Sequence, residues 1–348
     1  MSGLIVKAVN VDTGTTRSVK ANADGTYRLP KLPSGNYRVS VVKGDTILKQ
    51  SNYRVALGAN TVANFDMTGK NTEVINVVGT NVSMIDVGSS DSGLTLGSVE
   101  INKMPVARNI TAVALLAPGV VKGSSDFGNT ASFGGSSVAE NACYINGLEV
   151  TNTRKGLGCG EVPFEFYKEF QVKTGGYSAK FGRATGGTIN SITKSGTNEW
   201  KFAATAHFTP NGLRSAGQAS RGNGGTGHVF RDSRLDASQT SEFTLSVGGP
   251  IIKDKLFIYA LVNPRDVTSS FTNNISTYGQ YKPNNIYADR KASMKDNTFW
   301  GTKIDWDIDE NNRLSYFGYS NRSNTTETDY AYNGDTNRAR SYFDLTKQ

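Results

Sequence analysis

Alternation of apolar and polar residues, the pattern of β-strands, runs through most of the chain. Near the start, a turn signal at Asp24-Gly25 separates short alternating runs, and Tyr37, Val39 and Val41 share one face of a later run. Short strands joined by turns of this kind are typical of a small β-sandwich. We assign the sandwich to residues 1–68.

Residues 69–93 have polar ends like a linker, but they enclose the β-prone apolar run EVINVVG. Such a run is either an edge strand of its own domain or a strand left free to join another protein's sheet. The run consists of Glu73, Val74, Ile75, Asn76, Val77, Val78 and Gly79.

Residues 94–198 have the pattern of a compact α+β unit. A helical run from Ile110 to Ala117 stops at Pro118-Gly119, and Asn146-Gly147 is a strong hairpin signal. A strand near residue 170 follows. One face of this strand holds Phe166, Lys168, Phe170 and Val172, and its expected solvated positions are Glu165, Glu169 and Lys173.

From Glu199 onward the alternation is typical of antiparallel membrane strands. Phe243, Leu245 and Val247 fall on one face of a strand, and longer polar connections at 210–239 and 264–297 alternate with short turns. We count about five strands in residues 199–348. A soluble β-sandwich is the alternative, although its connections are seldom so unequal.

Composition agrees with a mainly β fold, because the 348 residues include 38 Gly, 16 Phe and 15 Tyr. The formal net charge of +8 is spread thinly, and the sequence has no dense basic cluster. We therefore expect no nucleic-acid partner. The amino terminus also lacks the pattern of a signal peptide.

Cys143 and Cys159 flank a polar loop whose closure by a disulfide would stabilise the fold by about 3 kcal/mol. A disulfide would imply an oxidising compartment, whereas two free buried thiols would imply a reducing one. His207 and His228 stand alone in the sequence. We therefore expect no metal site and no cofactor.

The glycine-rich stretch from Gly175 to Trp200 does not fit nucleotide binding or catalysis. Lys194-Ser195 lacks the glycine spacing and the following helix of a phosphate-binding loop. Ser191 and Lys194 form an S-x-x-K pattern, but the K-T-G at 173–175 precedes it, the reverse of the order in penicillin-recognising enzymes. We expect no enzyme activity, and we interpret the glycines as sites of close backbone approach.

The first 68 residues resemble the carboxypeptidase regulatory-like module. The matching residues are Asp24, Gly25, Tyr27, Leu32, Pro33, Gly35 and Tyr37. That family usually opens with one more strand, so we expect that the chain begins inside the module.

The glycine-rich stretch resembles the end of the plug domain of TonB-dependent outer-membrane receptors. The match comprises Glu169 to Val172, Gly175 to Ser178, Phe181-Gly182, Gly186 to Asn190 and Thr193-Lys194, with further matches at Leu115-Leu116, Pro118 to Val120 and Ile145 to Gly147. Together with the regulatory-like module, it indicates the Oar-like branch of that family.

The resemblance implies a plugged transmembrane β-barrel in the outer membrane, with the plug and the amino-terminal module on the periplasmic side. It also implies outer-membrane lipid around the barrel and energised uptake of an extracellular ligand, with TonB as partner. Iron chelates, glycans, cobalamin and peptides all use this architecture. An adhesion or signalling protein of the same architecture is the alternative function.

The resemblance gives roles to particular residues. The run from Glu73 to Gly79 becomes the candidate TonB box, the strand that adds to a sheet edge of TonB. Arg108 and Arg183 are candidates for ion pairs between plug and barrel wall, or they are ordinary surface arginines. The expected plug motif consists of Asn146, Gly147, Gly176, Gly182, Arg183, Gly186 and Gly187.

Plugged receptors have about 22 strands of about ten residues each. The chain after Glu199 is too short for that number. We therefore expect a piece of a longer protein, truncated at both ends.

Overall fold

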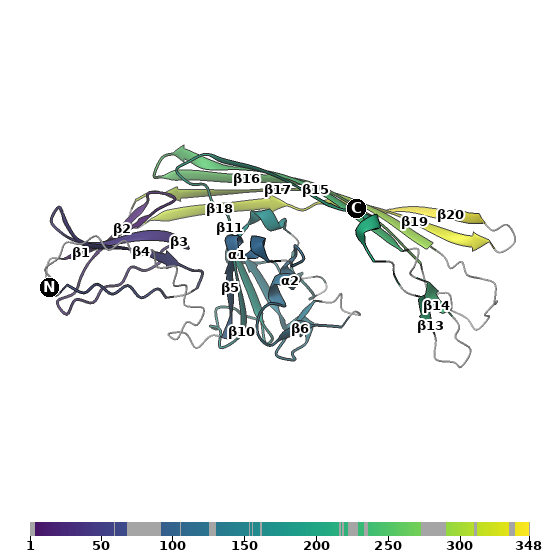
Figure 1. The fold of residues 1–348 in the computed structure, drawn as a ribbon, viewed down its shortest axis with the longest axis horizontal. Coiled ribbons are helices and arrows are strands. Elements are labelled where there is room, and N and C mark those ends of the chain that lie inside the picture. Colours follow the sequence, from purple (N-terminus) through teal and green to yellow (C-terminus); the bar gives the residue numbers. More distant parts are fainter. Residues whose placement is uncertain are drawn as a thin grey trace. The chain divides into compact units, whose positions relative to one another are not determined.

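The structure is a computed structural model, and its secondary structure is mostly strand (Figure 1). The residues that it describes are 4–58, 60–67, 92–104, 106–124, 130–152, 154, 156–160, 162–215, 217, 219–221, 229–232, 236–272, 290–309, 312–333 and 338–347. They divide into two compact units. The first is Met1–Lys201, Val247–Ala260 and Thr302–Gly318; the second is Phe202–Ser246, Leu261–Gly301 and Tyr319–Gln348.

The amino-terminal module is built on an antiparallel sheet with the order β2-β1-β3-β4. The strands are β1 (Ile5–Asn10), β2 (Thr16–Lys20), β3 (Gly35–Lys43) and β4 (Thr46–Val55). Tyr37, Val39 and Val41 are buried together, which confirms the predicted face of β3. Side chains from the irregular segments on either side, including Tyr27, Leu32 and Phe65, cover this core.

The plug, in which Figure 1 labels β5, β10 and β11, is built on a second sheet. Its order is β5-β10-β11-β8-β9, and β8 runs parallel to β11. Its strands are β5 (Ser92–Gly97), β8 (Ala142–Ile145), β9 (Leu148–Glu149), β10 (Tyr167–Gly175) and β11 (Thr188–Thr193). The accompanying elements are α1 (Ser98–Lys103), α2 (Ile110–Ala114), β6 (Val120–Lys122), β7 (Ala131–Phe133) and the 3-10 turns η2 (Val138–Glu140) and η3 (Phe164–Phe166).

Helix α2 begins at a side-chain cap and is shorter than the sequence pattern. The side chain of Asn109 accepts a hydrogen bond from the Ala112 backbone N–H at 2.8 Å, which satisfies a free donor of the first turn. Val113 and Ala114 are fully buried and belong to the same core cluster as Phe170 of β10. The helix therefore packs on the apolar face of the plug sheet.

The predicted hairpin turn joins β8 to β9. Asn146 has φ 50° and Gly147 has φ 85°. These left-handed conformations are the ones that a two-residue turn between right-twisted strands requires, and Asn and Gly tolerate them best. The hairpin prediction is confirmed.

The polar side chains of β10 correct one expectation. Glu169 and Lys173, expected in solvent, are 3% and 6% exposed. The backbone N–H of Leu57 donates to Glu169 at 2.9 Å, and the Lys173 ammonium lies 5.8 Å from the centre of the Phe181 ring. Glu165 pairs with Arg108. Groups from other segments of the chain bury these side chains. Alternation of apolar and polar residues alone cannot predict such burial.

The carboxy-terminal strands form a sheet with the order β12-β15-β16-β17-β19-β20, and β18 also pairs with β17. Outward side chains such as Phe243, Leu245 and Trp306 are exposed, whereas Thr244 and Asp305 on the opposite face are buried. The strands are β12 (Lys201–Thr209), β15 (Ala237–Ile252), β16 (Leu256–Thr272), β17 (Arg290–Asp307), β18 (Arg313–Ser320), β19 (Ser323–Asn333) and β20 (Arg338–Lys347).

These strands reach into segments that were expected to be loops. β16 continues to Thr272 and β17 begins at Arg290, so both enter the polar segment at 264–297. The segment at 210–239 contains η4 (Asn211–Leu213), β13 (Ala219–Arg221) and β14 (Val229–Asp232). Pairing of strands uses main-chain hydrogen bonds, so it continues where the side chains become polar.

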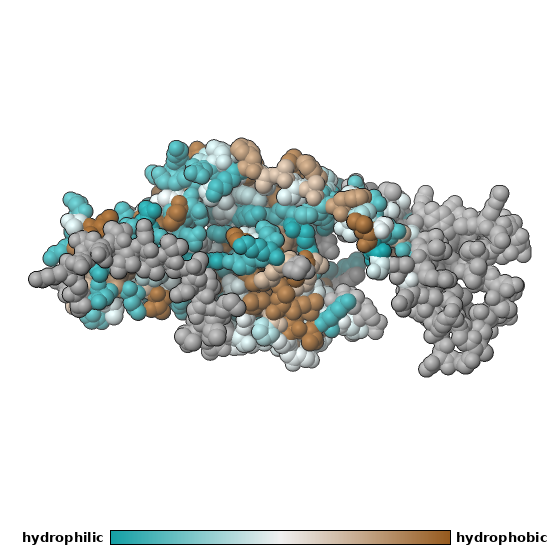
Figure 2. All heavy atoms as spheres, in the orientation of Figure 1, coloured by the Kyte–Doolittle hydropathy of each residue, from teal (hydrophilic) through white to brown (hydrophobic). Residues whose placement is uncertain are grey.

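One apolar patch lies on the plug. Figure 2 shows apolar side chains gathered over α2 and β6. Leu116, just after α2, is 38% exposed, and Val121 of β6 is 57% exposed.

Gly187 gives a test of packing in the plug. A Cβ atom added there would lie 2.2 Å from the Phe133 ring, whereas one added at Gly182 would meet nothing within 4 Å. We expect Gly187→Ala to reduce the free energy of unfolding by about 1–3 kcal/mol through overpacking. Gly182→Ala is the control and should leave it nearly unchanged. Equal unfolding midpoints of the two variants in calorimetry would contradict the tight contact.

Candidate functional site

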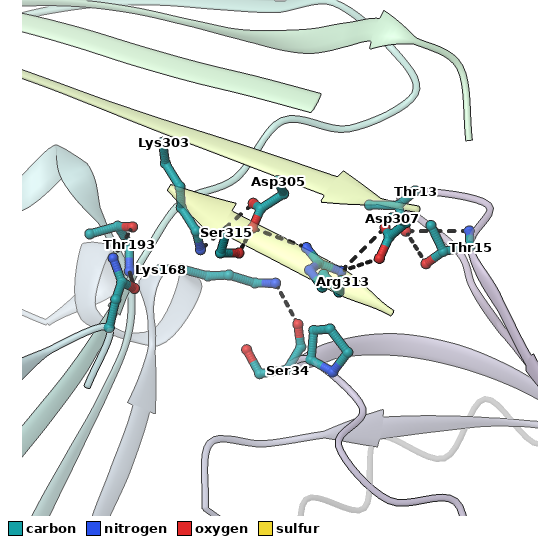
Figure 3. A network of polar contacts seen from close by, with 12 residues as sticks. Thr13, Thr15, Ser34, Lys168, Thr193, Lys303, Asp305, Asp307, Arg313 and Ser315 are labelled. Atoms are coloured by element: carbon teal, nitrogen blue, oxygen red, sulfur yellow. Dashed lines mark hydrogen bonds and ion pairs between the residues drawn. The ribbon is translucent and has the colours of Figure 1, made fainter. Parts of the chain in front are cut away.

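A cluster of charges lies on the inward face of β17 and β18, in the first compact unit (Figure 3). Asp305 is 2% exposed, and its carboxylate lies 3.2 Å from the Arg313 guanidinium and 3.8 Å from the Lys303 ammonium. Ser315 also hydrogen-bonds to Asp305, and Arg313 pairs with Asp307 at 3.3 Å. A buried carboxylate is tolerated only when it is compensated in this way.

Lys168 extends from β10 of the plug toward this cluster (Figure 3). Its ammonium donates to the backbone carbonyl of Ser34 in the module at 2.7 Å. Burial lowers the pKa of Lys168, and the nearby carboxylates of Asp12 and Glu169 oppose part of that shift. The side chain thus connects plug and module next to the charged strands.

Asn198 is a second junction residue, at the point where the chain passes from the plug sheet to β12. Its backbone N–H donates to the carbonyl of Asp12 at 3.0 Å. Its side-chain amide donates to the carbonyl of Thr13 and to the Asp254 carboxylate, both at 2.7 Å, and accepts from the Asp254 backbone N–H at 2.9 Å. Asn198 therefore joins a turn of the module to the turn between β15 and β16.

Gly196 explains how the connecting segment fits between these strands. A Cβ atom there would lie 2.4 Å from the carbonyl oxygen of Ile258 and 2.6 Å from that of Gly249. Both obstacles are backbone atoms, which cannot move aside as a flexible side chain would. The glycine permits the plug connection to lie directly against β15 and β16.

The two predicted arginines do not come together with the barrel-wall charges. Arg108 pairs with Glu165, a plug residue, and lies 5.0 Å from the centre of the Phe164 ring. An ion pair of Arg108 with the barrel wall stays a prediction. Arg183 is exposed with φ 64°, and within the described part of the chain no ion pair joins it to a carboxylate.

The other predicted plug residues serve the plug's own architecture. The side-chain amide of Asn146 donates to Thr193 Oγ1 at 2.9 Å and accepts from the Thr193 N–H, so it ties the hairpin to β11. Gly176 has φ 69°, and added Cβ atoms at Gly186 and Gly187 would meet Ser136 and Phe133. Their part in transport remains a prediction.

Cys143 and Cys159 are joined by a disulfide, with their Cα atoms 5.7 Å apart. The bond closes the β8–β9 hairpin against the segment that follows it, where Thr151 pairs with Cys159.

The candidate TonB box from Glu73 to Gly79 lies outside the described residues. Over the ranges that are described, no group of three or more His, Cys, Asp or Glu side chains is placed to hold a metal ion. Within those same ranges, none of the helices is both long and apolar enough to cross a membrane.

Sequence reasoning missed Lys168, Asn198 and Asp254 as junction residues. For the barrel wall, the sequence did contain a signal of the charged cluster. Lys303, Asp305 and Asp307 alternate along one predicted strand and fall on its inward face. Asn198 and Asp254 resemble ordinary turn residues, and Lys168 was placed only on the same strand face as Phe166, Phe170 and Val172.

A small β-sheet module, a glycine-rich plug and a sheet of long amphipathic strands define the class of plugged β-barrel receptors. The family models agree. Residues 1–68 match the carboxypeptidase regulatory-like domain, and residues 89–188 match the TonB-dependent receptor plug domain.

The chain is similar to the TonB-dependent transporter Oar of Myxococcus xanthus, with 30% identity over 74% of this chain and 24% of that protein. It is also similar to the ferrienterobactin receptor of Escherichia coli K12, with 30% identity over 37% of this chain and 20% of that protein. The crystal structure of the outer-membrane transporter YddB from Escherichia coli matches 69% of this chain and 36% of that chain, at 17% identity and a TM-score of 0.47.

The chain belongs to the TonB-dependent receptors, and its regulatory-like module is of the Oar type. It spans about a quarter or less of the length of the curated relatives that it matches.

The burial of the Lys168 ammonium predicts that the free energy of unfolding depends on pH. The pKa of Lys168 is lowered in the folded protein, so the cost of burying its ammonium is fully present at lower pH. This cost disappears as pH rises through the lowered pKa toward the ordinary value of 10.5. The charged groups around Lys168 are Asp12, Glu169, Asp305 and Arg313.

We therefore expect the difference in unfolding midpoint between the native protein and Lys168→Met to shift in favour of the native protein as pH rises. Calorimetry at a series of pH values measures that difference, and Lys180→Met, at an exposed lysine, is the control. A difference independent of pH would contradict the assigned burial cost.

Proposed function

We propose that this chain works in an outer-membrane receptor that takes up a scarce extracellular ligand with energy supplied through TonB. The plug carries this proposal, because it is joined by its connecting segment to β15 and β16 with direct backbone contact at Gly196. A plug held in this way does not leave a barrel spontaneously, so opening a path requires external work. The similarity to the TonB-dependent transporter Oar supports the same function.

The outward side chains of the sheet support a location in the outer membrane. Phe202, Phe243, Leu245 and Trp300 are between 44% and 77% exposed, and the buried Thr244 lies between Phe243 and Leu245. Lipid would bury these side chains favourably. In this arrangement the module and the plug meet the periplasm, where TonB acts.

We further propose that the run from Glu73 to Gly79 is the TonB box. Its apolar, β-prone sequence between module and plug suits addition as a strand to a sheet edge of TonB. The main-chain hydrogen bonds of such a strand supply much of the affinity.

Val77→Pro tests this assignment in the receptor that carries this chain. Proline removes a backbone donor, so we expect cross-linking between the box and TonB to be lost while extracellular ligand binding remains. Val77→Ala keeps the donor and should retain most of the cross-linking. Undiminished cross-linking of the proline variant would refute the assignment.

Deletion of the receptor gene tests uptake. Growth would be compared on media in which one nutrient at a time is scarce, with the intact gene restored as control. Transport predicts a growth defect on at least one such medium. Normal growth on all of them, with altered attachment or altered gene expression, would favour adhesion or signalling instead.

A further inference from the structure

The module covers the polar face of the plug strand β10. Glu169 and Gln171 are only 3% and 6% exposed. Glu169 accepts a hydrogen bond from the backbone N–H of Leu57 at 2.9 Å, and Gln171 donates to the Leu57 carbonyl at 2.6 Å. Two plug side chains thus satisfy both backbone groups of one module residue.

The two surfaces lie close together at two glycines of the described chain, Gly58 and Gly97. Gly58 has φ 67°, and a Cβ atom added there would lie 2.7 Å from Oε1 of Gln171. At the end of β5, a Cβ atom added to Gly97 would lie 2.5 Å from the Arg54 guanidinium, which pairs with Glu100 at 3.1 Å.

The same module also reaches the barrel strands. Gly14 has φ 71°, and a Cβ atom added there would lie 2.2 Å from the Asp254 carboxylate. Asn198 bonds to Thr13 of the module and to Asp254 of the β15–β16 turn. The module therefore contacts the plug and the barrel at the same time.

We call this contact surface the module seam. It comprises Asp12, Thr13, Gly14, Ser34, Arg54, Leu57 and Gly58 of the module, with Gly97, Glu100, Lys168, Glu169, Gln171, Asn198 and Asp254 opposite.

The hydrogen bonds and the ion pair of the seam are interactions that water can replace. The apolar cores of the module and the plug are separate clusters that, among the described residues, have no member in common. Each domain therefore keeps its own core when the seam opens. Exchange of protein hydrogen bonds for water costs little per bond, so the seam can open without unfolding either domain.

We propose that the module is a releasable clamp. Docked along the seam, it fastens β10 of the plug to the β15–β16 turn of the barrel, and it undocks before the plug moves. The undocking step rests on the proposed function, because it takes its energy from the pull of TonB. Docking of the module does not rest on the proposed function.

Docking is tested with the purified receptor that contains this chain. Arg54→Cys with Glu100→Cys places thiols on the two sides of the seam, and a short bismaleimide should join them. Arg54→Cys with Lys180→Cys is the control. Glu169 of β10 pairs with Gly97 near Arg54, whereas Lys180 follows the opposite end of β10, which lies about 20 Å from Glu169, and it should not be cross-linked.

Asn198→Asp should weaken docking, because the new carboxylate oxygen would face the Thr13 carbonyl and the Asp254 carboxylate. We expect the ratio of docked to undocked module to fall about tenfold, the effect of losing the one side-chain hydrogen bond from Asn198 to the module. Gln171→Leu removes the donor to Leu57 without touching the barrel, so it tests the seam even if Asn198→Asp fails to fold. Unchanged cross-linking in both variants would overturn docking.

Release is tested with the same cysteine pair in cells with and without TonB. The clamp predicts less cross-linking in energised cells that contain TonB. Equal yields of the cysteine cross-link with and without TonB would overturn release by pulling, if TonB still cross-links to the receptor near Val77 in the cells that contain it. Absence of TonB cross-linking would instead refute the proposed function and with it the release step, while the docking result in the purified receptor would stand.

Discussion

Compensation of buried charge is the constraint on which the junction of plug and barrel strands depends. Asp305 is almost fully buried, so Arg313, Lys303 and Ser315 must stay close to it. Loss of one partner would leave an uncompensated charge, which costs far more than a surface ion pair contributes. Lys303 and Asp305 of β17 and Arg313 and Ser315 of β18 therefore lie together on one face of the paired strands.

Apolar contacts and polar contacts have different roles in the first compact unit. Apolar clusters around Tyr37 in the module and around Phe170 in the plug hold each domain together. Polar contacts at Leu57 and Asn198 set how the domains meet. Since hydrogen bonds are directional and replaceable by water, they give a defined but reversible arrangement.

Local patterns predicted the local features well. Asn146-Gly147 predicted its turn because those residues tolerate left-handed backbone, and the alternation of Phe243 and Leu245 predicted an outward apolar face. The end of α2 and the length of β16 were predicted less well. They depend on packing and on main-chain pairing, which continue or stop independently of side-chain polarity.

The sequence by itself determined the mainly β fold and the resemblance to a plugged receptor with an amino-terminal module, because these follow from periodicity and short motifs. Only the tertiary structure decided that Arg108 pairs with Glu165 inside the plug, that the module buries Glu169, and that Asn198 joins three parts of the chain. The reason is physical: the partner of a polar side chain is the group that folding brings within hydrogen-bonding distance, and that group can lie more than a hundred residues away in sequence, as Leu57 does from Glu169.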